Sequence, residues 1–152
     1  MNDTENKTQK YKLNIDLIPD ACWCTNLRHI MKPHDWDVIR RDAYERANGK
    51  CMICNRPAKR LEAHEVWDFD EKKGIQKLTD IIALCHLCHS VIHMARTSLA
   101  GNEDAAIKHF MRVNKCTYTD YIHAWNEANE VHRRRNLVAE WQLDVSWLSR
   151  FG

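Results

Sequence analysis

Apolar and polar residues alternate near both ends of the chain. Leu13, Ile15 and Leu17 alternate with polar positions across residues 12–18, the pattern of a strand that buries one face against a core. Residues 141–147 alternate in the same way and begin and end with a tryptophan. We therefore expect a short strand at each of these positions, and we expect the two strands to pair with each other.

Helical spacing appears first over residues 36–48. Apolar residues recur there at intervals of three or four positions, beginning with Trp36, and so lie on one face of a helix. Asp35 is suited to cap the first turn, because its carboxylate can accept from free backbone N–H groups. Gly49 can adopt the left-handed conformation that ends a helix. The sequence predicts a helix that ends just before the first pair of cysteines.

The middle of the chain changes between extended and helical patterns. Residues 60–67 and 75–78 predict two strands, joined by a turn over 68–74 that is rich in acidic, basic and glycine residues. Helical patterns follow in three places: residues 87–98, residues 103–114, and a helix opened by the capping-box sequence Thr117-Tyr-Thr-Asp120. This mixture of elements predicts an α+β fold.

Length and composition agree with one soluble domain. The chain has 152 residues, of which 44% are hydrophobic and 29% charged, and this is enough to bury a core. We expect residues 11–152 to form the domain and the polar residues 1–10 to be a disordered tail. Because no apolar run reaches the length of a membrane span and the chain starts without an apolar signal segment, we expect a cytoplasmic location.

The cysteines carry the clearest chemical signal. Cys51 and Cys54 form one C-x-x-C pair, and Cys85 and Cys88 form a second. In the reducing cytosol, paired cysteines are typical metal ligands, and two such pairs can close a tetrahedral zinc site. The other cysteines are expected to be small apolar residues of the core, as are two tryptophans that could otherwise stack on bases: Cys22, Cys24, Cys116, Trp36 and Trp67.

Positive charge gathers around the first cysteine pair. The formal net charge is only +2, but residues 1–60 hold twelve Lys or Arg and eight Asp or Glu. Arg56, Lys59 and Arg60 follow the first pair directly. Basic side chains beside a metal site suit a phosphate backbone, and an ordinary solvated surface explains the charge equally well.

Residues 51–93, taken as one unit, resemble the HNH endonuclease family. They contain, in the order of that family's ββα-metal core, a cysteine pair, a strand with His64, a turn, a second strand, another cysteine pair, and a helix with His89 and His93. The match covers about the middle third of the chain. The chain also resembles bacterial proteins of HNH type in stretches such as His64-Glu-Val-Trp67 and Trp141-x-Leu-Asp144, which widens the match toward most of the chain.

The resemblance implies a fold, an activity and two metal sites. The HNH-like core would occupy residues 48–98, with a helical C-terminal extension at about 102–147. The four paired cysteines would hold structural zinc, and the three histidines would hold a second divalent ion (Mg²⁺, Mn²⁺, Ni²⁺ or Zn²⁺) for hydrolysis of DNA phosphodiester bonds. Beside the basic residues already named, three more are expected to contact nucleic acid: Lys72, Lys73 and Arg96.

Two positions depart from the family pattern. Glu65 stands where the family has the histidine that acts as general base, and Asp80 stands where it has an asparagine. Glu65 can be the base, an additional metal ligand, or the mark of a site that no longer cuts. Asp80 can orient His64 or Glu65, or ligate the metal. His86, between the second pair of cysteines, is expected to be an exposed residue without a role in the site.

The substitution at position 65 keeps a different class of function open. In that alternative the protein is a catalytically inactive, zinc-stabilised module that binds nucleic acid or a protein. A protein partner would suit a phage or prophage factor that acts on a host system.

Overall fold

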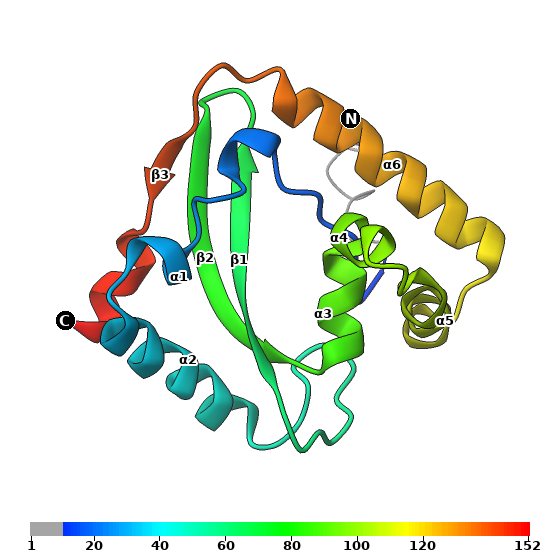
Figure 1. The fold of residues 1–152 in the computed structure, drawn as a ribbon, viewed down its shortest axis with the longest axis horizontal. Helices are drawn as coiled ribbons and strands as arrows, with labels where there is room; N and C mark the ends of the chain where they lie inside the picture. Colours follow the sequence, from blue (N-terminus) through cyan, green and yellow to red (C-terminus); the bar gives the residue numbers. More distant parts are fainter. Residues whose placement is uncertain (1–10) are drawn as a thin grey trace, which may run out of the picture.

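The computed structural model describes residues 11–152 and confirms a mixed α+β fold (Figure 1). The predicted tail, residues 1–10, lies outside the described residues. The helices are α1 (Leu27–Ile30), α2 (Pro33–Ala47), α3 (His86–Ile92), α4 (Met94–Leu99), α5 (Glu103–Asn114) and α6 (Tyr118–Asn136). The strands are β1 (Glu62–Asp70), β2 (Ile75–Leu84) and β3 (Gln142–Asp144), and two short 3₁₀ segments are η2 (Asp20–Cys22) and η3 (Ser146–Phe151).

A long antiparallel hairpin of β1 and β2 forms the centre of the fold. Its register runs from Glu62 opposite Leu84 to Asp70 opposite Ile75, with a bulge between Val66 and Trp67. The second strand is longer than the predicted 75–78, because its buried apolar residues continue to the second cysteine pair.

The turn of this hairpin is set by two local features. The carboxylate of Asp70 accepts from the backbone N–H groups of Lys72 and Lys73, each at 3.0 Å. Gly74 has φ of 66°, and a Cβ there would lie 2.9 Å from the carbonyl oxygen of Glu140. A glycine is therefore required where the chain before β3 approaches the hairpin.

The two faces of the hairpin bury two separate apolar clusters. Successive residues of a strand point to opposite faces, so Ile81 and Ala83 pack in the cluster that contains Trp36 and Trp67, while Leu84 packs with α3, α5 and α6. Figure 1 shows α2 on one side of the hairpin and α3 to α6 on the other. The prediction that both tryptophans belong to the core is confirmed, since each is 8% exposed.

The predicted strand at residues 12–18 is wrong, although its alternation does bury Leu13 and Leu17. The backbone of Leu13 bonds to a side chain instead of a strand: its N–H donates to Asn114 Oδ1 at 2.9 Å, and its carbonyl accepts from Asn114 Nδ2 at 2.8 Å. The N–H of Asp16 donates to the carbonyl of Ile92 at 3.0 Å. This extended segment is therefore held by helical elements.

The predicted pairing of the two end segments is also wrong. β3 lies parallel to β2, with Ile75 opposite Gln142 and Lys77 opposite Asp144. Within residues 11–152 the sheet has three strands in the order β1-β2-β3. The C-terminal segment thus completes the edge of the hairpin, and η3 follows where the prediction extended the strand to residue 147.

The predicted helix at residues 87–98 is interrupted. It breaks into α3 and α4 at His93, whose φ of −95° and ψ of 46° leave the helical region. The hydroxyl of Thr97 donates to the carbonyl oxygen of Ser90 at 2.8 Å, which gives that carbonyl a partner across the break. The break turns the chain at one of the candidate metal ligands.

The helices predicted over residues 36–48 and 103–114, and the helix opened by Thr117, agree with the structure to within a few residues, whereas α1 was not predicted. α2 begins at Pro33, so Asp35 lies within its first turn and does not cap it, and the left-handed residue that ends it is Asn48, before Gly49. The capping box is present, because Thr117 and Asp120 bond each other's backbone N–H groups. Among the described residues, none of the helices combines the length and apolar character that crossing a membrane requires.

Candidate metal centres and the adjoining groove

The first cysteine pair lies in a tight turn between α2 and β1. The N–H of Asn55 donates to the carbonyl of Cys51 at 2.9 Å, and the N–H of Cys51 donates to the carbonyl of Arg56 at 3.0 Å. Asn55 adopts the left-handed conformation, with φ of 62°, which lets the chain reverse. The turn is joined to the hairpin because the N–H of Met52 donates to the carbonyl of Ala83 at 3.0 Å.

The second pair begins α3, directly after β2. Cys85 is the N-cap of this helix, and its Sγ accepts from the N–H of Cys88 at 3.4 Å. The end of β2 therefore carries one pair toward the turn that holds the other, although the two pairs are about thirty residues apart in the sequence.

The four thiols meet at one point, as the sequence predicted. The Sγ atoms of Cys51, Cys54, Cys85 and Cys88 all lie within 4.8 Å of one another. A tetrahedral zinc site with Zn–S bonds of about 2.3 Å has sulfur atoms about 3.8 Å apart, and the Cys54–Cys85 separation is 3.9 Å. A hydrogen bond from Cys88 lowers the pKa of the Cys51 thiol to about 4. This cluster could hold a structural metal such as zinc.

Three histidines form a second cluster. His64 comes from β1, His89 from α3, and His93 from the junction of α3 and α4. One ring nitrogen of each lies within 4.8 Å of the other two, and the ring centroids are separated by 5.2, 5.2 and 4.8 Å. The sequence predicted this convergence, and the three rings could together hold a metal ion.

Burial favours the uncharged form of these imidazoles. It is the main cause that lowers the pKa of all three rings, and the pKa of His93 falls to about 3. The positive charge of Arg96 contributes in the same direction. A neutral imidazole offers a lone pair to a metal, so burial favours the protonation state that ligands need.

Glu62 contacts the histidine cluster, and the sequence reasoning did not select it as a site residue. Its Oε1 accepts from Nδ1 of His89 at 2.8 Å, and its Oε2 accepts from Nδ1 of His86 at 3.0 Å. Burial favours a higher pKa for Glu62, but these two bonds lower it. With the proton of His89 held on Nδ1, the lone pair on Nε2 is available to a metal. The sequence did contain a signal for Glu62: residues 62 and 64 are two apart on one strand, so their side chains point to the same face.

Glu65 lies apart from the three histidines and outside the group of residues whose ligand atoms converge. Its Oε1 accepts from the N–H of Leu27, the first residue of α1, at 2.6 Å, and its Oε2 accepts from Nε1 of Trp67 at 3.2 Å. Burial raises its pKa, while both hydrogen bonds oppose that rise. The carboxylate thus joins β1 to α1, a role that the sequence reasoning did not consider.

Asp80 makes contacts on β2 and α2. Its Oδ1 accepts from the N–H of Ile81 at 2.7 Å and lies 3.9 Å from Nη1 of Arg46. Arg46 also donates to the carbonyl of Ile81 at 2.7 Å. Asp80 therefore contacts α2 and neither orients His64 or Glu65 nor belongs to the converging ligands, and the carboxylate beside the histidines is that of Glu62.

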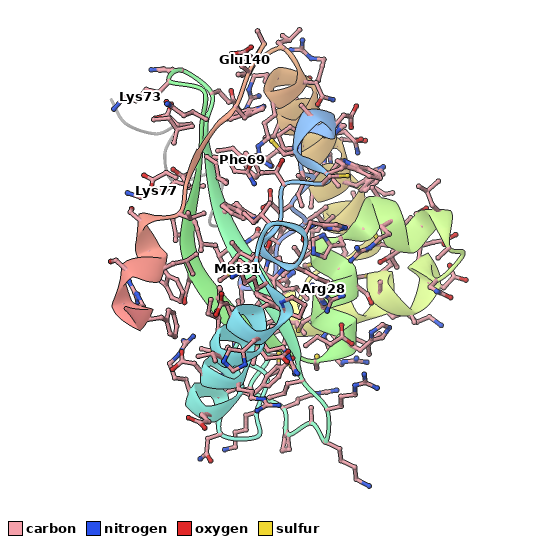
Figure 2. The ribbon with its side chains drawn as sticks, turned by 60° about the vertical axis from the view of Figure 1, so that its left-hand side comes forward. Arg28, Met31, Phe69, Lys73, Lys77 and Glu140 are labelled. Atoms are coloured by element: carbon pink, nitrogen blue, oxygen red, sulfur yellow. The ribbon has the colours of Figure 1, made fainter. Side chains whose placement is uncertain are left out.

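A basic groove of about 970 Å³ adjoins the histidines. We call it the basic groove; His89 lines it, and its cationic lining residues are Arg28, Arg40, Lys59, Arg60 and Arg96. Figure 2 shows Arg28 projecting from α1 on the side that faces α3 and α4. Both carboxylates that line the groove already have partners, because Asp37 bonds Arg40 at 2.7 Å and Glu62 bonds the two histidines. Its net charge is positive.

The other residues predicted to contact nucleic acid are not among those that line the basic groove. Lys72 and Lys73 are on the turn of the hairpin, and with a rise of about 3.3 Å per residue this turn is roughly 25 Å from His64. Figure 2 shows Lys73 at the hairpin tip, far from Arg28. Arg56 follows the first cysteine pair and lies close enough to His109 for its charge to lower the pKa of that ring.

The remaining predictions about single residues have mixed outcomes. Cys22 is buried, as expected, and Cys116 is partly buried, but Cys24 is exposed and is not a core residue. His86 is exposed at 78% of its side chain, as expected, yet it bonds Glu62.

Comparison with family models, with curated proteins and with solved structures found no match.

Proposed function

We propose that this protein is a metal-dependent endonuclease of HNH type that hydrolyses phosphodiester bonds in DNA. The observation that carries the proposal is the convergence of His64, His89 and His93 next to a basic groove that His89 also lines, together with a cluster of four thiols. The order hairpin, cysteine pair, helix is that of the ββα-metal core, which supports the resemblance stated from the sequence.

Each group of residues has a distinct part in the proposed reaction. The three histidines would hold the catalytic ion, which when bound supplies a Lewis acid for the charge on the scissile phosphate and the departing oxygen. Glu62 orients His89. Among the described residues, Arg28, Lys59, Arg60 and Arg96 make no ion pair, so they can bind phosphate oxygens along the groove.

Glu65 remains our proposed general base, with one supporting observation. A carboxylate is a weak base at its usual pKa of about 4.3, and burial raises the pKa of Glu65 in the direction that general-base catalysis needs. To act, its Oε2 must exchange the weaker bond to Trp67, 3.2 Å long, for one to the attacking water.

The proposal is tested by plasmid nicking. Purified protein is incubated with supercoiled DNA and Mg²⁺, Mn²⁺, Ni²⁺ or Zn²⁺ in turn, and the open-circular product is quantified. We expect cleavage with at least one ion, and we expect His93→Ala to lower the rate by more than about 100-fold. His123→Ala, which removes an exposed imidazole on α6, is the matched control. Absence of cleavage with all four ions between about pH 6 and 9 would reject the endonuclease.

A second candidate function is that of an inactive binding module. The observation that favours it is that both oxygens of Glu65 already accept hydrogen bonds, from Leu27 and Trp67. Glu65→His restores the residue of the family pattern. If the parent is inert and this variant cuts DNA, the binding module is correct. If the parent cuts and the variant does not, Glu65 is the working base.

A further inference from the structure

Helix α5 reaches the cluster of four thiols through a buried histidine. His109 is 1% exposed, and its Nε2 lies 3.1 Å from the Sγ of Cys88, which is fully buried. This histidine belongs to the C-terminal helices, outside residues 48–98. Its ring is not one of the converging ligands at either metal cluster in the described residues, so its contact with Cys88 needs a separate explanation.

The neighbour of His109 determines which ring nitrogen carries the proton. Nη2 of Arg112 lies 2.7 Å from Nδ1 of His109. A guanidinium has five N–H donors and no acceptor, so Nδ1 must be the acceptor in this bond. The proton of the neutral ring is then on Nε2, and Nε2–H donates to the Sγ of Cys88. Arg112, His109 and Cys88 form a chain of hydrogen bonds that all point toward the sulfur.

The chemistry of a four-thiolate site suggests a role for this series of hydrogen bonds. Four thiolates around a divalent zinc ion leave a net charge of about −2, and a buried charge is unfavourable unless donors stabilise it. An N–H donor backed by a guanidinium draws electron density from one sulfur. A thiolate that donates less density is a weaker nucleophile and reacts more slowly with oxidants and alkylating agents.

We propose that His109, positioned by Arg112, protects the Cys88 thiolate of a zinc-bound cluster and fastens α5 to that cluster. The proposal depends on the metal assignment of the four cysteines and is independent of nuclease activity, so failure of the DNA assay leaves it intact. His109 is a positioning residue here, because it acts through Cys88.

Thiolate reactivity tests the proposal. Zinc-loaded protein is treated with iodoacetamide, which forms a thioether on the attacked sulfur and releases iodide. Alkylation of each cysteine is followed by mass spectrometry, and released zinc by a chromophoric chelator. In His109→Phe we expect Cys88 to be alkylated, and zinc to be lost, about 10- to 100-fold faster than in the parent. Cys54 and Cys85 provide the internal comparison, since their rates should change much less.

Two further variants separate hydrogen bonding from packing. His109→Gln keeps an N–H donor, so we expect it to restore slow alkylation of Cys88. In protein loaded with Co²⁺, the thiolate-to-metal absorption band should shift in His109→Phe and return toward the parent position in His109→Gln. His123→Phe on α6 controls for the substitution itself.

The outcomes that overturn the proposal are definite. If His109→Phe is folded and retains Cys88 alkylation at the parent rate, His109 does not protect the sulfur. If His109→Phe fails to fold, Arg112→Met decides, because it removes the outer donor of the chain and leaves His109 in place. We expect faster alkylation of Cys88 in that variant, and an unchanged rate overturns the proposal.

Discussion

Glu65 accepts hydrogen bonds from two donors, and this makes a conservative substitution informative. Oε1 accepts from the N–H of Leu27 and Oε2 from Nε1 of Trp67. A glutamine has the same shape but only one acceptor oxygen. In Glu65→Gln, one of the two donors must therefore face an amide NH₂ group and lose its partner.

The magnitude follows from the environment of the carboxylate. A donor that loses a buried partner costs about 1–3 kcal/mol. Glu65 is half-buried, and burial of its charge already disfavours the carboxylate, as the raised pKa shows. We therefore expect Glu65→Gln to lower the free energy of unfolding by about 1 kcal/mol, or the melting temperature by about 2–4 °C for a chain of this length.

A double-mutant cycle isolates the cause. Trp67→Phe removes the second donor, so Glu65→Gln in that background leaves Leu27 with its acceptor and should cost almost nothing. Urea unfolding of the four proteins should give a coupling of about 1 kcal/mol. An equal cost of Glu65→Gln in both backgrounds, or none in either, would refute this account of the carboxylate.

The same four proteins distinguish the roles proposed for Glu65. If Glu65 is the general base, Glu65→Gln should slow nicking by about 10² to 10⁴ in both backgrounds, because the proton acceptor is lost in each. If it only joins β1 to α1, the double variant should cut at the rate of Trp67→Phe alone.

Three further predictions concern the two metal clusters and the groove. Cys54→Ser, or strong chelation, should unfold the region around the hairpin because metal binding contributes to folding free energy; unchanged far-ultraviolet circular dichroism would exclude a structural metal, and the exposed Cys24→Ser is the control. Glu62→Gln should weaken Ni²⁺ binding at the histidines by about 10- to 100-fold in calorimetry, whereas Glu71→Gln, which affects a pair with Arg134, should leave the affinity unchanged. For a DNA duplex, Lys59→Gln with Arg60→Gln should reduce the slope of log affinity against log salt by about 0.9 for each phosphate that the protein no longer neutralises. Lys72→Gln with Lys73→Gln should leave that slope unchanged, and equal slopes for the two pairs would contradict the assignment of the groove.

The members of both candidate metal sites could be named from the sequence. Two C-x-x-C pairs place each pair of thiols within one turn, and histidines four residues apart at the start of a helix lie near one face. These relations are local, whereas the meeting of the two pairs, and of His64 with the other two histidines, was expected only from the resemblance to the HNH family. Local patterns likewise predicted α5, the capping box of α6, and the hairpin, whose turn residues lie between two apolar runs.

The partners of single side chains could not be predicted, because they come from distant segments. Glu62 has the spacing to share a face with His64, but its bonds to His86 and His89 depend on how α3 packs on β1. The pairing of Glu65 with the first residue of α1 joins positions 38 residues apart. Nothing near Cys88 in the sequence indicates that His109, on another helix, donates to its sulfur.

The first end segment, residues 12–18, shows the same division between local pattern and tertiary structure. The alternating pattern correctly predicted that Leu13 and Leu17 are buried, because such a pattern indicates which side chains face a core. It did not indicate which groups would bond the backbone, and an asparagine side chain on α5 took the place of a neighbouring strand. Spacing along the chain thus indicated the candidate ligands within each segment and the faces of elements, while packing between elements decided which segments meet and which hydrogen bonds form, since those depend on distances that only the folded chain sets.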